Sequence, residues 1–266
     1  MSQVDNILKR SPQKVITNDG SATLYSADFN QHYHNLSGAL TESRHVFFEQ
    51  NGICRALADH RDFTIFEIGF GTGFHMVLLE QYRFELQSRS RVSYFAVEKY
   101  PVMGQLIREM GFSDLFSGIS ETIEKTNRFS ENLYHIREEE TAFLDLPMTQ
   151  LRVFRADFSD WDLNRIGRPA DFIFHDAFSP KSNPELWTRR TFEKLLAISS
   201  RHGVLSTYCS ATRARAAMAL AGWHIARMKG PPGKREMTLA SPDDSMLGSH
   251  KRVNEHRLKK RFNNEL

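Results

Sequence analysis

The sequence predicts an α/β fold in which helices cover both faces of a mostly parallel, doubly wound sheet. Short, almost wholly apolar runs recur along the chain, with helix-like stretches between them. Such runs are typical of strands buried on both faces, and their alternation with helices indicates a parallel sheet. A glycine-rich turn follows the first run, and acidic residues end later ones. Because ligands bind beyond the carboxyl ends of the strands in such folds, we expect the functional site there.

The same patterns place the individual elements. The apolar runs predict strands over residues 63–70, 92–101, 151–157, 171–178 and 203–210, with closing strands over 224–230 and 235–241. The intervening stretches predict helices over about 73–82, 186–199 and 212–221, and a mainly helical region with loops over 101–145. A turn at Asn18-Asp19-Gly20 precedes short strand-like pieces near the amino end.

The composition excludes several classes of protein. The chain has 266 residues, 35 Lys and Arg against 32 Asp and Glu, and 40% hydrophobic residues, which suits one elaborated domain. No apolar run is long enough to span a membrane, and the first residues lack the pattern of a signal peptide. Cys54 and Cys209 form neither a disulfide framework nor a metal-binding pair. We therefore expect a cytoplasmic protein without membrane contact and without a metal.

We divide the chain into three parts. Residues 1–60 are expected to form an N-terminal extension that packs on the catalytic domain, residues 61–240 that domain, and residues 241–266 a basic tail. Clustered positive charge can meet phosphates, although a solvated tail that aids solubility explains the same charges. The tail holds one acid, Glu255, between His250 and Phe262, against the basic residues Lys251, Arg252, Arg257, Lys259, Lys260 and Arg261.

The sharpest local motif is the glycine loop at the end of the first buried strand. Its residues are Glu67, Gly69, Gly71 and Gly73, in the pattern E-x-G-x-G-x-G. Glycines suit a sharp turn from strand to helix where backbone and ligand approach closely. A dinucleotide site needs its third small residue one place later, where this chain has Phe74. The loop resembles the S-adenosylmethionine (SAM) loop of Rossmann-like methyltransferases, while a glycine-rich turn without a ligand stays an alternative.

Acidic residues stand where a nucleoside cofactor needs them. Glu98 ends the second strand, where a carboxylate can accept hydrogen bonds from both ribose hydroxyls. Asp157 ends the third, where it can accept from the adenine amino group. Asp176 stands at the end of the fourth and is followed by Phe178, an arrangement that suits a group holding an attacking amine beside an aromatic ring. Each of these residues also suits a helix cap, a surface charge or the core.

Taken in order, the motifs DGSATLY, YHNLSGALTESRHVFF, FEIGFGTGFH, FAVEKYP, HDAFSPKSNPELWT, TYCS and GPPGKREMTLA carry a resemblance. Over roughly Thr17 to Ala240 the chain resembles the tRNA 5-methylaminomethyl-2-thiouridine methyltransferase family, the methyltransferase half of a bifunctional enzyme that also occurs as stand-alone proteins. The resemblance implies a Rossmann-like class I fold and a SAM-dependent transfer of methyl to the primary amine of 5-aminomethyl(-2-thio)uridine. The acceptor would lie at the wobble position of the tRNA anticodon loop.

The resemblance also assigns residues. It implies that Asp176 sits at the transfer site, that Phe178, Lys234 and Arg235 face the substrate, and that Phe178, Trp187 and Tyr33 can stack on the base. Cofactor contacts are implied for Tyr33, Glu42, Glu67, Gly69, Gly71, Gly73, Glu98 and Asp157. Because no oxidoreductase part follows Leu266, we expect a separate enzyme to supply the aminomethyl form.

The chain departs from the family at Asn35, at Ala211-Thr212 and at Arg215. These departures affect the expected substrate contacts more than the expected cofactor contacts. Two other functions stay open. An aminopropyltransferase of the spermidine synthase kind shares the strand-end acids, but it favours an acidic acceptor pocket. A non-catalytic RNA-binding relic of the fold is supported only by the departures.

Overall fold

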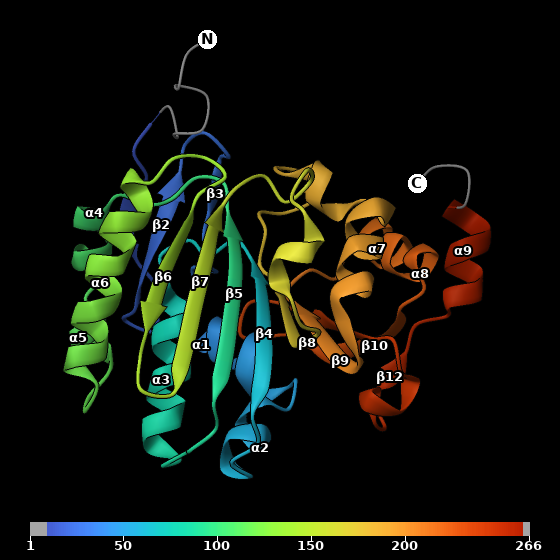
Figure 1. The fold of residues 1–266 in the computed structure, drawn as a ribbon. Helices are drawn as coiled ribbons and strands as arrows, with labels where there is room; N and C mark the ends of the chain where they lie inside the picture. The colour runs from blue at the N-terminus through green and yellow to red at the C-terminus, as the bar shows by residue number, and fades with distance from the viewer. Residues whose placement is uncertain (1–9, 263–266) are drawn as a thin grey trace.

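The computed structural model describes residues 10–262 and contains two sheets (Figure 1). The large sheet has nine strands in the order β12-β10-β11-β9-β8-β4-β5-β7-β6. Its strands are β4 (Phe63–Ile68), β5 (Val92–Glu98), β6 (Thr141–Asp145), β7 (Thr149–Arg155), β8 (Ala170–His175), β9 (Ser199–Thr207), β10 (His224–Lys229), β11 (Glu236–Ser241) and β12 (Lys251–Arg252). The small sheet consists of β1 (Gln13–Ile16), β2 (Ala22–Ser26) and β3 (Gln31–His32).

The centre of the large sheet is parallel, as the sequence predicts. β4 pairs in parallel with β5 on one side and with β8 on the other, and β7 and β9 extend this parallel core. The order therefore reverses beside β4, which makes its carboxyl end the switch point where ligands bind in such sheets. β11 pairs antiparallel with β9 and β10, and β6 pairs antiparallel with β7. The α/β, mostly parallel, doubly wound fold is thus confirmed.

One predicted region is wrong in part. Residues 101–145 were expected to be mainly helical, but β6 forms the edge of the sheet at their end. Strands at the edge of a sheet bury fewer of their side chains than central strands, and Phe143 in β6 is 63% exposed. Such a strand does not need the continuous apolar run that marks the central strands, so the sequence pattern did not reveal it.

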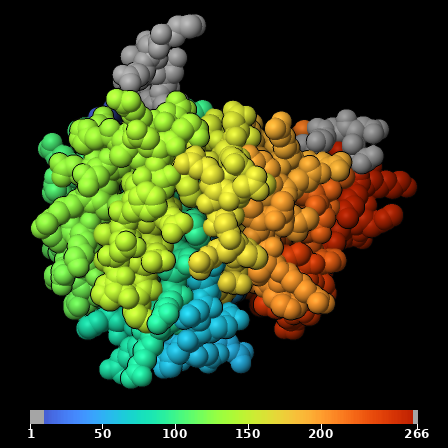
Figure 2. All heavy atoms as spheres, in the orientation of Figure 1, coloured from blue at the N-terminus to red at the C-terminus, as the bar shows by residue number. Residues whose placement is uncertain are grey.

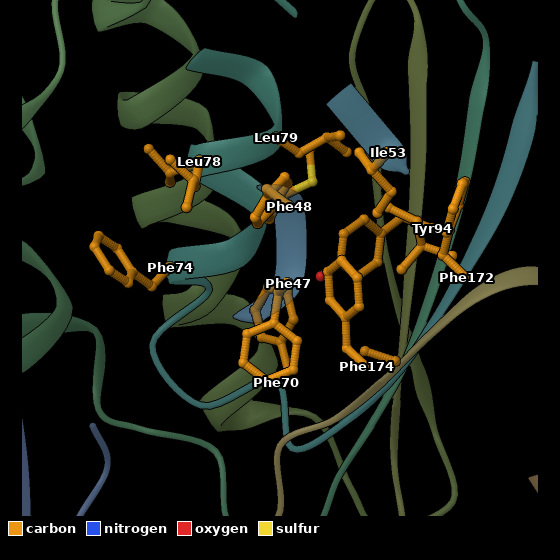
Figure 3. Close-up of a cluster of buried hydrophobic side chains, with 14 of the residues drawn as sticks. Phe47, Phe48, Ile53, Phe70, Phe74, Leu78, Leu79, Tyr94, Phe172 and Phe174 are labelled. Atoms are coloured by element: carbon orange, nitrogen blue, oxygen red, sulfur yellow. The ribbon is translucent and has the colours of Figure 1, made fainter. Parts of the chain in front are cut away.

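Helices cover both faces of the sheet and enclose two apolar cores. Figure 1 places α4, α5 and α6 at one end of the sheet and α7, α8 and α9 at the other. Figure 3 shows Phe47 and Phe48 beside Tyr94 and Phe174, which come from the sheet, while Phe74 points away from them. The helices are α1 (Ala39–Arg44), α2 (Ile53–Ala58), α3 (Phe74–Glu85), α4 (Gly104–Glu109), α5 (Phe112–Leu115), α6 (Ser120–His135), α7 (Arg189–Ile198), α8 (Thr212–Ala221) and α9 (Glu255–Phe262), with a π-helical turn over His45–Glu49.

The N-terminal segment packs against the loop that follows β8. The side-chain oxygen of Gln31 accepts a hydrogen bond from the backbone N–H of Ser179 at 3.1 Å. Phe29 stacks on Phe178, with ring centroids 4.4 Å apart. The expected boundary after residue 60 falls in the loop between α2 and β4. This segment therefore forms a wall at the carboxyl edge of the sheet.

The basic segment after residue 240 is folded where the structure describes it. The expected boundary falls in the last residues of β11, and β12 then adds to β10 at the edge of the sheet. α9 packs beside α8, and Figure 2 shows it (red) on the outer margin of the molecule. Residues 263–266 of the expected tail lie outside the described residues. Within residues 10–262, no helix is both long and apolar enough to cross a membrane.

Candidate active site

A cavity of about 910 Å³, its open mouth included, lies at the carboxyl ends of the parallel strands. Ligand pockets commonly enclose a few hundred to about 1,000 Å³. The loops after β4, β5, β7 and β8 line it together with the N-terminal segment. Of the sequence-predicted residues, those that line the cavity are Tyr33, Gly69, Gly71, Glu98, Asp157, Asp176 and Phe178. Those that do not are Glu42, Glu67, Gly73, Lys234 and Arg235.

The glycine loop needs its glycines for two reasons. Gly69, Gly71 and Gly73 all have positive φ, of 87°, 54° and 74°, a region that side chains with Cβ rarely adopt. A Cβ on Gly69 would also lie 3.1 Å from the backbone oxygen of Asp176. This close approach joins the loop after β4 to the loop after β8. Gly73 caps α3, so it shapes the loop without facing the cavity.

Glu98 closes the loop from the neighbouring strand. Its carboxylate accepts hydrogen bonds from the backbone N–H of Gly71 at 2.8 Å and of Tyr100 at 2.7 Å. Burial raises the pKa of Glu98, and the hydrogen bonds from Gly71 and Tyr100 oppose that rise. The carboxylate thus lies in the cavity wall, fixed by the backbone on both sides.

Asp157 stands at the end of β7 in a more open position. Its carboxylate accepts from Lys99 Nζ at 2.7 Å and from the backbone N–H of Ser159 at 2.8 Å. Partial burial raises the pKa of Asp157, but the hydrogen bonds from Lys99 and Ser159 outweigh it and leave the pKa lowered. An ionised acceptor is therefore available at this corner of the cavity.

Asp176 follows β8 and lines the cavity beside Gly69. Its side chain makes no hydrogen bond or ion pair with any residue between 10 and 262. Burial raises the pKa of Asp176 well above its ordinary value, and Glu67 adds to this while His75 opposes it. A desolvated carboxylate without a protein partner is a good acceptor for a group that enters the cavity.

Glu67 supports the site from below. Its two carboxylate oxygens accept from His75 Nδ1 at 2.6 Å and from the Tyr94 hydroxyl at 2.8 Å, and the residue is 1% exposed. The expectation that Glu67 contacts the cofactor therefore does not match its position. His75, which sequence reasoning missed, stands in the first turn of α3 and lines the cavity. Its position directly after the glycines, at the end of the motif FEIGFGTGFH, is the sequence feature that points to a place beside the cavity.

Glu42 and Lys234 form a second support, which corrects two further expectations. Lys234 Nζ pairs with Glu42 Oε1 at 2.6 Å and lies 3.9 Å from the centroid of the Tyr208 ring. The other oxygen of Glu42 accepts from the backbone N–H of Asn35 at 2.6 Å. Glu42 and Lys234 thus tie α1 to the turn between β10 and β11 instead of facing a cofactor or a phosphate. Arg235 is exposed, and its side chain has no partner among residues 10–262.

Aromatic rings close the cavity from the N-terminal side. Phe178 stacks on Phe29, and the Tyr33 ring meets Phe178 edge-on at 5.1 Å. Burial, with a smaller contribution from Glu98, raises the pKa of Tyr33. Trp187, expected to stack on a base, is instead 4% exposed and donates from its indole to the backbone oxygen of Phe178 at 2.7 Å. It therefore positions the Phe178 loop from the core.

Two departures from the family pattern have structural uses. Asn35 Nδ2 donates to the backbone oxygen of Pro232 at 3.1 Å, which joins the N-terminal segment to the turn between β10 and β11. Arg215 is 7% exposed and donates to Thr238 and to a carboxylate oxygen of Glu236, both at 3.0 Å. Both residues are thus engaged inside the protein, and Ala211 directly precedes α8.

One group of described residues has a spacing that could suit a metal. A ring nitrogen of His34, a ring nitrogen of His75 and a carboxylate oxygen of Asp176 lie within 4.8 Å of one another. However, Glu67 holds Nδ1 of His75, and the Ser43 hydroxyl lies 3.2 Å from Nε2. Both ring nitrogens of His75 therefore already have partners within the protein.

Comparisons with known proteins find similar methyltransferases and tRNA-modifying proteins. A family model described as an S-adenosyl-L-methionine-dependent methyltransferase matches residues 121–243. The tRNA 5-methylaminomethyl-2-thiouridine biosynthesis bifunctional protein MnmC of Leptospira interrogans is 28% identical over 240 residues, which cover 89% of this chain and 36% of that protein. The protein of the same name from Delftia acidovorans is 30% identical over 80% of this chain and 32% of its own length. The chain thus spans about a third of the length of these curated relatives.

A solved structure supports the fold. The crystal structure of MNMC2 from Aquifex aeolicus matches with a TM-score of 0.66 and 23% identity, over 96% of this chain and 77% of that one. The glycine loop and the acids at the ends of β5 and β7 stand in the order that such a fold requires. The chain is thus similar to S-adenosyl-L-methionine-dependent methyltransferases over residues 121–243 and to about a third of the length of the MnmC proteins, and it shares the fold of MNMC2.

Proposed function

We propose that this methyltransferase transfers a methyl group from SAM to the primary amine of a 5-aminomethyl(-2-thio)uridine at the wobble position of tRNA. The observation that carries the proposal is Asp176, a desolvated carboxylate without a protein partner that lines the same cavity as the glycine loop and Glu98. The matching part of the MnmC proteins supplies the class of acceptor. The uridine must already carry its aminomethyl group, so an earlier reaction, which we assign to a separate enzyme, installs it. We place the reaction in the cytoplasm.

The residues present fit the cofactor. Gly69 leaves room where a Cβ would meet the backbone of Asp176, and Glu98 and Asp157 offer acceptors at neighbouring strand ends. Thr72 also lines the cavity, and its buried hydroxyl has no hydrogen-bond partner among residues 10–262. We assign the ribose hydroxyls to Glu98 and the adenine amino group to Asp157.

The chemistry asks the protein for a neutral amine in line with the methyl group. When bound, SAM supplies an electrophilic methyl on a sulfonium. An alkyl ammonium has a pKa near about 10 by analogy with lysine, so the acceptor enters mostly protonated. The ammonium must first lose its proton to solvent. We assign to the ionised Asp176 the hydrogen bond that then orients the neutral amine, and the walls around it exclude water. An ionised carboxylate also stabilises the ammonium form, so orientation is the larger contribution of Asp176.

The base must leave the stack to react. Anticodon-loop bases can be splayed out and stacked on aromatic rings, and Phe178 with Phe29 forms the aromatic wall nearest to Asp176. Because these two rings already stack on each other, we propose that the base uses the face or edge that this pair leaves open. Arg235 and the exposed basic residues of α9 are then the groups available for phosphates.

An aminopropyltransferase is the second candidate. The buried acids Glu42 and Glu67 near Asp176 favour a cationic acceptor of either kind. However, Glu42 is neutralised by Lys234 and Glu67 is hydrogen-bonded to His75, so neither is free for a polyamine. We therefore favour the tRNA acceptor.

Methyl-labelled SAM tests the choice. The purified protein is incubated with SAM and tRNA from cells that lack this protein, and the nucleosides are separated by mass spectrometry. The expected result is conversion of the 5-aminomethyl nucleoside to the 5-methylaminomethyl form. Label on no nucleoside, together with alkylation of putrescine by decarboxylated SAM, would instead support the aminopropyltransferase.

A further inference from the structure

Two histidines share the acceptor end of the cavity with Asp176, and the mechanism above uses neither. His34 comes from the N-terminal segment and His75 from α3, and both line the cavity. One ring nitrogen of each lies within 4.8 Å of a carboxylate oxygen of Asp176. Because their surroundings differ, the pKa values of the two rings shift in opposite directions.

His75 is built to hold a positive charge. Nδ1 lies 2.6 Å from Glu67 Oε1, and Tyr94 holds the other oxygen of that carboxylate at 2.8 Å. Figure 3 shows Tyr94 within the apolar cluster beneath the site. A hydroxyl can donate or accept, so Ser43, 3.2 Å from Nε2, suits either charge state. Burial lowers the pKa of His75, but the charge and hydrogen bond of Glu67, together with the charges of Asp176 and Glu42, outweigh burial and leave the pKa raised.

His34 is built to stay neutral. The Thr23 hydroxyl oxygen accepts from the backbone N–H of His34 at 3.0 Å, so its hydrogen is free for Nδ1 of the ring at 3.1 Å. Burial, together with the positive charges of His75 and Lys234, lowers the pKa of His34 to about 3, and Asp19 opposes them only weakly. His34 is therefore uncharged throughout the neutral range.

We propose that His75, held as an imidazolium by Glu67, is the positioning residue that extends the ionised range of Asp176 to lower pH for its contact with the acceptor amine. This inference rests on the proposed function of Asp176. It assigns to the FEIGFGTGFH motif a second task besides the glycine loop: the motif supplies both members of the Glu67–His75 pair.

The charges that face Asp176 support this assignment. Burial, Glu67 and Glu42 favour its protonated form, whereas His75 and Lys234 favour the ionised form, with His75 the stronger of the two. Lys234 already pairs with Glu42 at 2.6 Å. An opposite charge within about 4–6 Å lowers the pKa of a carboxyl group by about 1–3 units. Loss of the imidazolium therefore raises the pKa of Asp176, so the residue becomes protonated at higher pH.

The test is the pH dependence of kcat/KM for methyl transfer to the tRNA acceptor. In His75→Gln the acid limb should move to higher pH by about 1–3 units, with about a tenfold loss of rate for each unit below the limb. His34→Gln is the matched control, because it removes a neutral ring from the same cluster. It should leave the position of the limb unchanged, whatever it does to the rate.

A double variant guards against a folding defect, since His75→Gln leaves the buried carboxylate of Glu67 uncompensated. Glu67→Gln with His75→Gln removes both charges, and Glu67 itself raises the pKa of Asp176. The acid limb of the double variant should therefore lie between those of the wild type and of His75→Gln. An unshifted limb in folded, SAM-binding variants would overturn the inference and show His75 to be only a packing residue.

A second readout does not depend on the acceptor. NMR titration of the imidazole signals, assigned with the two single variants, should show His75 charged at pH 6.5 and His34 neutral. A neutral His75 at that pH would overturn the inference. Absence of methyl transfer by the wild type would contradict the proposed function instead, and would leave this titration as the deciding test.

Discussion

The two ends of the cavity are built in different ways. The cofactor end takes Gly69, Gly71, Glu98 and Asp157 from successive turns that follow parallel strands. The acceptor end joins residues from the segments before and after β3, from α3 and from the loop after β8, and it is supported by α1 and the turn between β10 and β11. The first end is a property of the sheet, whereas the second is assembled by tertiary contacts. We therefore expect cofactor binding and methyl transfer to be separable by mutation.

The largest effect is expected at the acceptor end. Asp176→Asn keeps the shape of the side chain but removes its charge. Turnover should fall by about 10²–10⁴-fold, while SAM affinity stays within a few fold of the wild type. Single-turnover kinetics and a binding titration measure the two quantities. Turnover close to that of the wild type would remove Asp176 from the mechanism and end the division between the two ends.

A substitution at the cofactor end should have the opposite effect, with SAM affinity lost and turnover kept. Glu98→Gln replaces one carboxylate oxygen by an amide nitrogen, which cannot accept, so one of the two hydrogen bonds from Gly71 and Tyr100 is lost and the charge is removed. Hydrogen bonds to charged groups contribute about 1.5–3 kcal/mol each, so SAM affinity should fall by about 10- to 100-fold. At saturating SAM, turnover should recover. Asp157→Asn is the comparison, with a smaller loss expected because Asp157 is only partly buried. Unchanged affinity in the Glu98 variant would contradict the ribose assignment.

The close approach of Gly69 to the backbone of Asp176, which joins the two ends, can be tested with a pair of glycines. Gly69→Ala and Gly20→Ala both place a Cβ at positive φ, 87° and 84°, which costs about 1–3 kcal/mol of stability each. The new Cβ at position 69 also lies 3.1 Å from the backbone of Asp176, whereas position 20 has no neighbour within 4 Å. Thermal unfolding should therefore show a larger loss for Gly69→Ala, and only this variant should lose SAM affinity. Equal SAM affinity in both variants would show that the join is dispensable.

The smallest effect is expected far from the cavity. Lys259 and Lys260 are exposed on α9, and Lys259→Ala with Lys260→Ala should weaken tRNA binding. Removal of one charge that binds a phosphate reduces the slope of log affinity against log salt by about 0.7–0.9. Lys125→Ala with Arg128→Ala on α6, at the other end of the sheet, makes the same change in net charge and should leave the slope unchanged (Figure 1). Equal slopes for both pairs would make α9 a bystander.

The sequence predicts the cofactor end better than the acceptor end for a physical reason. Glycines and acids that directly follow buried strands must meet at one edge of a parallel sheet, so local motifs suffice for Gly69, Glu98 and Asp157. The pairing of Glu42 with Lys234 joins positions that are 192 residues apart, and nothing local marks it. Trp187 illustrates the same limit, because an indole that stacks on a ligand and one that is buried look alike in a sequence.

A crystal structure with S-adenosylhomocysteine, the demethylated product, tests the central claim most directly. We expect the ribose hydroxyls to contact Glu98 and the sulfur to face Asp176 across the space of a methyl group. A product bound outside this cavity, or with its sulfur turned away from Asp176, would contradict this claim.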